Sequence, residues 1–196
     1  MREVELKGVV ADAPALRQRL LDAGAREVFA GALSDRRFDL PARDLAARDQ
    51  VLRLRVYRDA SGARAMLDWK GPAAYEAGYK VREELSSPCD DASMAQMLEQ
   101  LGYVVTREID RDIEQFELGG AMLRIERYPR MDTLLEVEGA PDAIEHAIAH
   151  AGLPRDDFTS ERLPDFILRY EARTGARAAI CTRELAGDYR YSVADA

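Results

Sequence analysis

The sequence has 196 residues, 47% hydrophobic and 33% charged, with a formal net charge of −8. This length fits one globular domain, which we place at residues 1–175, followed by a tail of uncertain structure at 176–196. The acidic balance argues against nucleic-acid binding, and no apolar run is long enough to span a membrane. Cys89 and Cys181 lack metal-ligand spacing, so we expect reduced thiols in a cytoplasmic protein. The sequence leaves the oligomeric state open, and a homodimer is one of the alternatives.

The chain opens with a strand pattern. In the segment Glu3–Lys7, Glu3, Glu5 and Lys7 share one face, while two apolar residues share the other. A helix is expected from the Asp12 cap to Gly24. Residues 25–39 predict one or two short strands, with Arg36-Arg37 interpreted as a solvated turn, and residues 41–49 predict a loop.

The middle of the chain is predicted to form mainly strands joined by short turns. Strands are predicted at residues 51–57, 65–70, 78–85, 103–118, 122–128 and 134–138, with turns at Ser61-Gly62 and Gly119-Gly120. Helices are predicted from Asp90 or Asp91 to Gly102, at 142–151, and at 161–173. Short connections favour an antiparallel sheet or barrel over a parallel sheet.

Nearly every predicted strand has one apolar face and one face with charges of both signs. The in-phase acids include Glu3, Glu5, Glu136 and Glu138, and the in-phase cations are Lys7, Arg53, Arg55, Lys70, Lys80, Arg82, Arg107, Arg111 and Arg124. An open sheet could leave this charged face in water, or a closed sheet could enclose it as a wet lumen with the helices outside. Alternation alone does not choose between the two.

The chemistry of these charges favours the closed arrangement. Clustered carboxylates repel one another unless a cation lies among them, and Mg²⁺ or Mn²⁺ prefers oxygen ligands. Clustered Arg and Lys side chains need an anion in turn, and Arg donates to phosphate in bidentate geometry. A triphosphate with its divalent metal would neutralise both sets.

Several motifs resemble those of one known family. Glu3-Val4-Glu5-Leu6-Lys7 matches an N-terminal Glu-x-Glu-x-Lys signature, and Glu136 and Glu138 match a late Glu-x-Glu strand. Between them come Arg53 and Arg55, Lys70-Gly71-Pro72, and Arg82-Glu83-Glu84. In this order, over residues 1–139, they resemble the CYTH or triphosphate tunnel metalloenzyme superfamily, which includes class IV adenylyl cyclases and thiamine triphosphatases.

The resemblance implies an α+β fold, a closed eight-stranded antiparallel β-barrel or tunnel with helices packed outside. By analogy, Mg²⁺ or Mn²⁺ would be held by Glu3, Glu5, Glu136 and Glu138, with Glu126 where the family usually has Asp. Lys7 and Lys70 become the candidate catalytic residues. The full set of expected triphosphate contacts is Lys7, Arg53, Arg55, Lys70, Lys80, Arg82, Arg107, Arg111 and Arg124. Phe38 stands where the family often has Tyr, so a hydroxyl used in some triphosphatases is absent.

Three functions remain open at this stage. A class IV cyclase would convert ATP to cyclic AMP and pyrophosphate, and this is our first expectation. A triphosphatase would instead direct water at the terminal phosphorus of an inorganic or organic triphosphate. A module that binds a triphosphate or nucleotide without turnover is the third reading, although four carboxylates are not needed to bind an anion. His146 and His150 are interpreted as surface residues.

Overall fold

The computed structural model describes residues 2–195, and for Arg2 and Glu3 it describes only the backbone. The expected metal-binding role of Glu3 therefore lies outside the described side chains. The strands are β1 (Arg2–Val10), β2 (Arg26–Asp39), β3 (Val51–Asp59), β4 (Gly62–Lys70), β5 (Ala74–Glu76), β6 (Tyr79–Cys89), β7 (Val104–Leu118), β8 (Ala121–Arg127), β9 (Thr133–Glu138) and β10 (Phe158–Thr159). The helices are α1 (Ala13–Asp22), α2 (Asp44–Ala47), α3 (Asp91–Gln100), α4 (Pro141–Ala151), α5 (Leu163–Thr174) and α6 (Thr182–Ala186).

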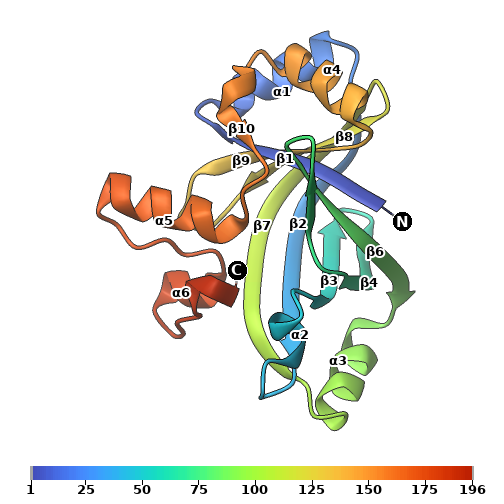
Figure 1. The fold of residues 1–196 in the computed structure, drawn as a ribbon, viewed down its shortest axis with the longest axis vertical. Coiled ribbons are helices and arrows are strands. Elements are labelled where there is room, and N and C mark those ends of the chain that lie inside the picture. The colour runs from blue at the N-terminus through green and yellow to red at the C-terminus, as the bar shows by residue number, and fades with distance from the viewer. Residues whose placement is uncertain (1, 196) are drawn as a thin grey trace.

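Eight of the strands close into a ring (Figure 1). Around the ring the order is β1, β9, β8, β7, β2, β3, β4 and β6, and the pairing of β6 with β1 completes it. Every pairing is antiparallel, while β5 and β10 are short additions on β6 and β1. Closure removes the exposed edges of an open sheet. The prediction of a closed antiparallel barrel is confirmed, and the open-sheet alternative is wrong.

The apolar faces of the strands point outward and are covered by helices. Leu6 and Val137 are almost fully buried against Leu16 of α1 and Ile148 of α4. A second cluster lies where Leu98 of α3 covers the β2–β3–β4 wall. These helices cover much of the outward apolar surface, although Leu85 of β6 stays 56% exposed, and the charged side of the strands faces the interior. Within residues 2–195, no helix has both the length and the apolarity to cross a bilayer.

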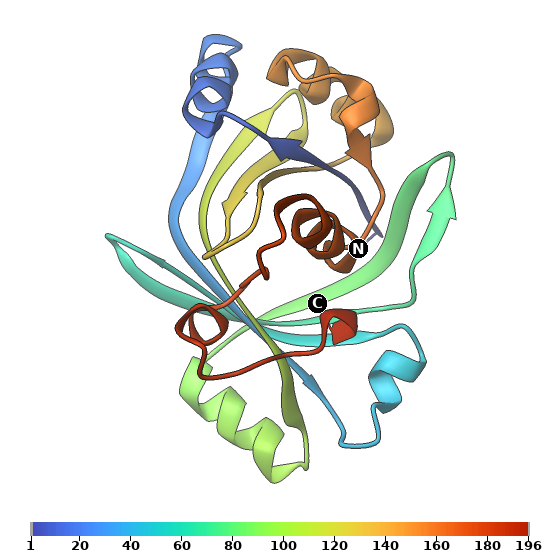
Figure 2. The same cartoon turned by 90° about the vertical axis from the view of Figure 1, so that its left-hand side faces the viewer.

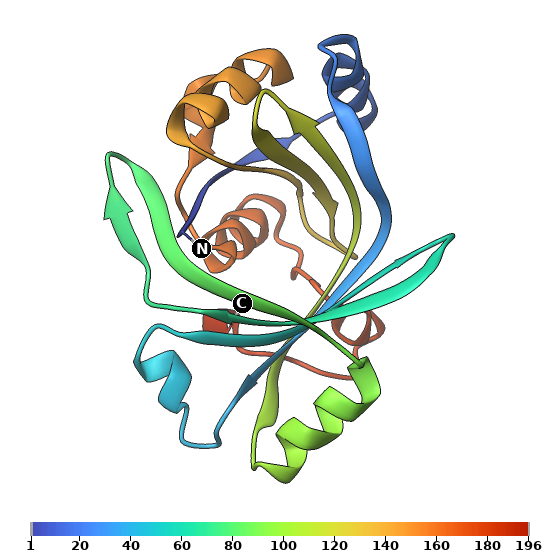
Figure 3. The same cartoon turned by 90° about the vertical axis from the view of Figure 1, so that its right-hand side faces the viewer.

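Helix α5 lies across one end of the ring of strands (Figure 2), and it is visible through the ring from the opposite side (Figure 3). Its apolar residues Leu163, Phe166 and Ile167 pack against Ile109 of β7 and Tyr128. This cluster stabilises the position of α5 over that end of the barrel, because each apolar side chain removed from water contributes about 1.5–3 kcal/mol.

Three local predictions were wrong. Residues 26–39 form one 14-residue strand, so Arg36-Arg37 lies inside a strand instead of a turn. The expected loop at 41–49 contains the short helix α2, and the strands β5 and β10 were not predicted.

The C-terminal segment, which the sequence left undefined, is attached to the barrel. Ala179 forms a backbone bridge with Arg130, and the Asp110 backbone N–H donates to the carbonyl of Ile180 at 2.8 Å. Ile180 and Cys181 are fully buried. The segment continues through α6 to a 3₁₀ turn at Val193–Asp195. It therefore contributes to the structure of the barrel instead of hanging free.

Candidate functional site

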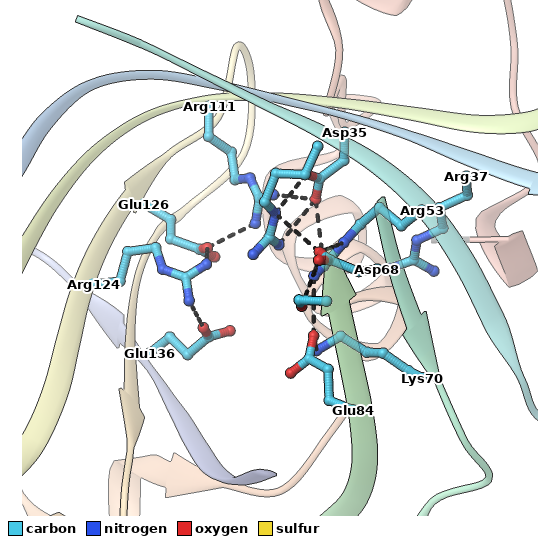
Figure 4. Close-up of polar contacts among 12 residues, drawn as sticks. Asp35, Arg37, Arg53, Asp68, Lys70, Glu84, Arg111, Arg124, Glu126 and Glu136 are labelled. Carbon is cyan, nitrogen blue, oxygen red and sulfur yellow. Dashed lines mark hydrogen bonds and ion pairs between the residues drawn. The ribbon is translucent and has the colours of Figure 1, made fainter. Parts of the chain in front are cut away.

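The interior of the barrel holds a cavity of about 230 Å³ with a mainly charged lining. Figure 4 shows carboxylates and guanidinium groups from different strands pointing toward one another inside it. The predicted site residues that line the cavity are Glu5, Lys7, Arg53, Arg55, Lys70, Lys80, Arg82, Arg111, Arg124, Glu126, Glu136 and Glu138. Residues from distant parts of the chain therefore meet in one enclosed space, as the charge pattern requires.

On the β1–β9 side, carboxylates surround a lysine. The Lys7 ammonium lies 2.8 Å from Glu5 Oε2 and 2.8 Å from Glu136 Oε2. Lys80 of β6 also donates to Glu5, and Glu138 lies opposite Glu5 in the β1–β9 pairing. The convergence follows from strand register, since in-phase residues of neighbouring strands share one face.

These contacts set the protonation states. Burial raises the pKa of Glu5, but the Lys7 and Lys80 charges outweigh it and bring the pKa to about 2. Burial lowers the pKa of Lys7, whereas Glu136 and Glu5 raise it well above its usual value. Lys7 therefore stays an ammonium group at neutral pH. It can stabilise negative charge, but it cannot serve as a general base.

The β8 strand connects the two sides of the cavity. Arg124 donates to Glu136 at 2.6 Å, and Glu126 accepts from Arg111 at 2.7 Å and from the Tyr128 hydroxyl at 2.6 Å. The Glu126 side chain is fully buried. Its carboxylate oxygens are both engaged by protein donors, so Glu126 would have to exchange a partner before it could bind a metal.

On the β2–β3–β7 side, arginines surround a single carboxylate. Asp35 accepts from Arg55 Nε at 2.9 Å and from Arg111, and it lies 3.6 Å from Arg53. Burial raises the pKa of Asp35, but Arg55, Arg111 and Arg53 together hold it well below its usual value. Asp68 supports the same group by accepting from Arg53 at 2.7 Å.

The sequence reasoning missed Asp35, which sits at the centre of the arginine group. Its signal was present in the alternation of residues 26–39, but the sequence left open whether this segment holds one strand or two, so the positions that share the inward face were not assigned. Arg37 was missed for the same reason, and it lines the cavity.

The remaining predicted cations lie toward the rim. Lys70 is 3.1 Å from Glu84, while Arg82 donates to the backbone carbonyls of Gly71 and Asp49, both at 2.6 Å. Solvent exposure rises at this side, because the side chains of Arg43 and Arg162 are 43% and 44% exposed whereas that of Arg111 is 6% exposed. We call this exposed side, formed by β2, α2 and the start of α5, the rim.

Arg107 is not among the residues that line the cavity. Its guanidinium makes a two-pronged contact with Glu184 of α6 at 3.0 and 3.1 Å, and it lies 5.2 Å from the centre of the Tyr191 ring. Arg107 thus anchors the C-terminal segment. Its position gives no support to the expected triphosphate contact.

Several cavity guanidiniums have hydrogen-bond donors left over. The Nε–H groups of Arg37, Arg111 and Arg124 are buried, and within residues 2–195 no protein atom accepts from them. Buried polar groups are normally paired, so such donors favour a ligand that brings acceptor oxygens. A phosphate chain is rich in these acceptors.

The carboxylates fit a divalent metal that shares its coordination with a ligand. Among the side chains of residues 4–195, which exclude that of Glu3, no group of three or more His, Cys, Asp or Glu forms a ready metal cluster. Mg²⁺, however, commonly binds through one or two carboxylates together with phosphate oxygens and water. Glu5 and Glu136 converge on Lys7 with oxygen donors of the required kind. These residues are therefore suited to a cation that arrives with a phosphate.

Comparison with known proteins agrees with the geometry. The model of the CYTH domain family matches residues 1–143. The PH1819 protein from Pyrococcus horikoshii is 20% identical, with a TM-score of 0.71 over 85% of this chain and 98% of its own. A candidate adenylate cyclase from Vibrio parahaemolyticus is 21% identical, with a TM-score of 0.71 over 85% and 97%. HpAC1 from Hippeastrum, a candidate adenylyl cyclase named for a dominant triphosphatase activity, is 17% identical, with a TM-score of 0.60 over 91% and 98%. No curated protein matches the sequence.

Proposed function

The chain belongs to the CYTH domain family, and from this premise we propose that it is a metal-dependent enzyme that hydrolyses a triphosphate held in the barrel. The observation that carries the proposal is the set of buried, unused Nε–H donors of Arg37, Arg111 and Arg124 beside converging carboxylates. Each unpaired buried donor costs about 1–3 kcal/mol, and phosphate oxygens in the cavity would offset this cost for all three. Arg107 has an unpaired Nε–H as well, but it lies outside the cavity.

Each group of residues has a defined part in this mechanism. Arg53, Arg55 and Arg111 would hold phosphate oxygens, since their planar guanidiniums match phosphate geometry. Lys7, kept protonated by Glu5 and Glu136, would stabilise charge that develops on the transferred phosphoryl group. Mg²⁺ or Mn²⁺ held by Glu5, Glu136 and Glu138 would supply further neutralisation of that charge. The function of Lys70, beside Glu84, would be to bind a phosphate oxygen.

The size of the cavity favours hydrolysis over cyclisation. Its volume of about 230 Å³ lies below the roughly 300–1,000 Å³ usual for drug-sized ligands, and charged side chains dominate its lining. It therefore suits a phosphate chain better than a whole nucleotide, whereas cyclisation requires the ribose hydroxyl to be held against the α-phosphorus. Hydrolysis is therefore the first candidate, although the sequence had favoured cyclisation.

Cyclisation remains the second candidate, because the rim could let a nucleoside extend outward from the cavity. Both activities occur among the names of the similar structures, which include the Vibrio cyclase candidate and HpAC1 with its dominant triphosphatase activity. At identities of 17–21% these likenesses carry the fold and leave the reaction to experiment.

A product assay tests the proposal directly. The purified protein is incubated with tripolyphosphate, thiamine triphosphate or ATP, each with Mg²⁺ or Mn²⁺ and each with a chelator control. Release of orthophosphate that requires the metal supports the triphosphatase. Cyclic AMP with pyrophosphate would instead establish the cyclase, and tight binding without any product would establish a binding module.

A further inference from the structure

Arg37 differs from the other arginines of the cavity in its partners. Within the part of the chain that the structure describes, its guanidinium makes one hydrogen bond, from Nη1 to the backbone carbonyl of Asp195 at 3.1 Å. Its Nε–H is buried without an acceptor, and among the described side chains, those of residues 4–195, no carboxylate oxygen lies within 4.0 Å of its guanidinium. Arg55 and Arg124, by comparison, each contact a carboxylate at 2.6–2.9 Å.

The charge of Arg37 is therefore poorly compensated. Burial and the nearby charge of Arg53 lower its pKa to about 9, with Arg111 adding to the effect and Asp35 opposing it. Removing a guanidinium from water beside other guanidiniums costs free energy unless an anion lies close to it. An anion in this part of the cavity would remove that cost.

In the free protein, the C-terminal segment occupies the space beside Arg37. Asp195 makes two parallel contacts with Arg43, from Nη1 to Oδ1 and from Nη2 to Oδ2, both at 2.9 Å. Asp195 and Ala194 are also part of the cavity lining. Asp195, an acidic residue of the same chain, therefore contacts both Arg37 and Arg43 at this side of the cavity.

The backbone beside this contact is unusual. Arg43 precedes helix α2 with φ of 63°, in the left-handed region that non-glycine residues seldom adopt. Asp39 holds this turn by accepting from the backbone N–H groups of Leu45 and Ala46, both at 2.9 Å. Strained backbone that the surroundings hold in place is frequent at binding sites. This turn therefore sets the backbone position of Arg43, which lines the cavity.

We propose that Arg37 and Arg43 form an additional anion-binding position at the rim, that Asp195 fills it in the free protein, and that a phosphate group of the substrate displaces Asp195. This inference rests on the proposed function, because it assigns the position to the same substrate. Asp195 is then an internal competitor: its carboxylate holds Arg43 and its backbone carbonyl holds Arg37, in the places that phosphate oxygens would take. Arg37 is a binding residue that touches the substrate, beyond those that the motifs indicate.

The first test measures the affinity for tripolyphosphate by titration calorimetry, with the full chain and without metal. Arg37→Gln should weaken binding about tenfold or more, since it removes a charge-assisted hydrogen bond. Arg36→Gln is the matched control, because Arg36 is the next residue on β2 and contacts Asp91 of α3, outside the cavity. Equal affinities of the two variants would overturn the proposal. Arg37→Lys keeps the charge and should retain part of the affinity. It replaces Arg37→Gln in the comparison if the glutamine variant does not fold.

The second test examines the competitor. Asp195→Asn should tighten tripolyphosphate binding about threefold, because the amide holds Arg43 less strongly than a carboxylate does. Asp188→Asn, an exposed change in the same segment, should have no effect. The gain should disappear when Arg37 and Arg43 are both changed to Gln. Unchanged or weaker binding in Asp195→Asn would contradict the displacement of Asp195.

The two proposals fail in distinguishable ways. If the wild-type protein binds tripolyphosphate but yields no product with metal, the proposed enzymatic function is wrong. The additional anion-binding position is then judged only by the affinities of the variants. If the wild type turns over triphosphate and Arg37→Gln behaves like Arg36→Gln, only the additional position falls.

Discussion

Two opposite walls of the cavity carry opposite excesses of charge. In the wall formed by β1 and β9, which we call the acidic wall, Glu5 and Glu136 share one lysine, Lys7. In the wall formed by β2, β3 and β7, which we call the arginine wall, Asp35 is shared by Arg55, Arg111 and, at 3.6 Å, Arg53. The acidic wall is therefore richer in carboxylates and the arginine wall richer in guanidiniums, and the neighbouring strands supply part of the balance through Lys80 and Arg124 on one side and Asp68 and Glu126 on the other.

This difference indicates the kind of ligand that the barrel accommodates. A lone anion would relieve the arginine wall and increase the repulsion at the acidic wall, and a lone metal ion would do the reverse. A polyphosphate with its divalent cation compensates both walls at once. Arg124, which donates to Glu136, already connects them in the free protein.

The largest effect is expected from the acidic wall. Glu5→Gln should lower metal-dependent turnover about 10²–10³-fold, because it removes a carboxylate that we assign to the metal. Steady-state release of orthophosphate measures the effect. Glu117→Gln is the control, since Glu117 is exposed, contacts Arg26 and does not line the cavity. Full activity in Glu5→Gln would refute the metal assignment.

Removal of the metal distinguishes the role of the acidic wall from that of the arginine wall. With a chelator present, turnover should fall to background, whereas tripolyphosphate should still bind, about tenfold more weakly, because the arginines keep their charge. Calorimetry with and without chelator checks this difference. Loss of all binding without metal would contradict the independent role of the arginine wall.

Asp35→Asn tests the arginine wall through stability. The free energy of unfolding at pH 7 should fall by about 3–5 kcal/mol, because three buried arginines lose their shared carboxylate. Urea unfolding followed by circular dichroism measures this change. Tripolyphosphate should stabilise the variant more than the wild type, since its oxygens replace the missing anion. Equal stabilisation of both proteins would show that the ligand does not reach Asp35.

The pH dependence of the unfolding free energy of the wild type and of Asp35→Asn has a defined sign. Because the arginines hold the pKa of Asp35 well below its usual value, the stability it contributes is present above about pH 4. It is lost as the pH falls through the lowered pKa. The gap in unfolding free energy between wild type and Asp35→Asn should therefore be constant from pH 7 to pH 5 and narrow below pH 4. If the gap in unfolding free energy widened in acid instead, the pKa of Asp35 would have to be raised and not lowered.

The smallest effect is expected from a conservative change. Arg55→Lys keeps the positive charge but loses the planar pair of donors, so the KM for tripolyphosphate should rise about tenfold with little change in kcat. Initial-rate kinetics distinguish the two constants. A fall in kcat alone would place Arg55 in the chemical step instead of in binding.

Much of the fold could be predicted because alternation is a local property. Leu6 and Val137 were expected on outward apolar faces, and both are buried beneath helices. The family resemblance and the closed antiparallel barrel are confirmed. The assignments of metal and triphosphate ligands stay predictions, although the cavity gathers all of the described candidates except Arg107.

The failures show where alternation stops being informative. Arg107 and Arg111 share a strand and a face, but four residues along a strand cover about 13 Å, which takes Arg107 to the C-terminal segment. Alternation says which side of a sheet a residue faces and not how far along the barrel it lies. Asp35 and Arg37 were missed because residues 25–39 were predicted only as one or two short strands, so no phase was assigned to the segment.

The amino-acid sequence by itself determined which side chains face inward, because a strand repeats every two residues whatever surrounds it. Only the tertiary structure decided which of those charges meet. Lys7 and Glu136, far apart in the chain, lie 2.8 Å apart because β1 pairs with β9 in one register. The placement of Asp195 beside Arg43 is likewise tertiary, since it depends on the path of the C-terminal segment along the barrel.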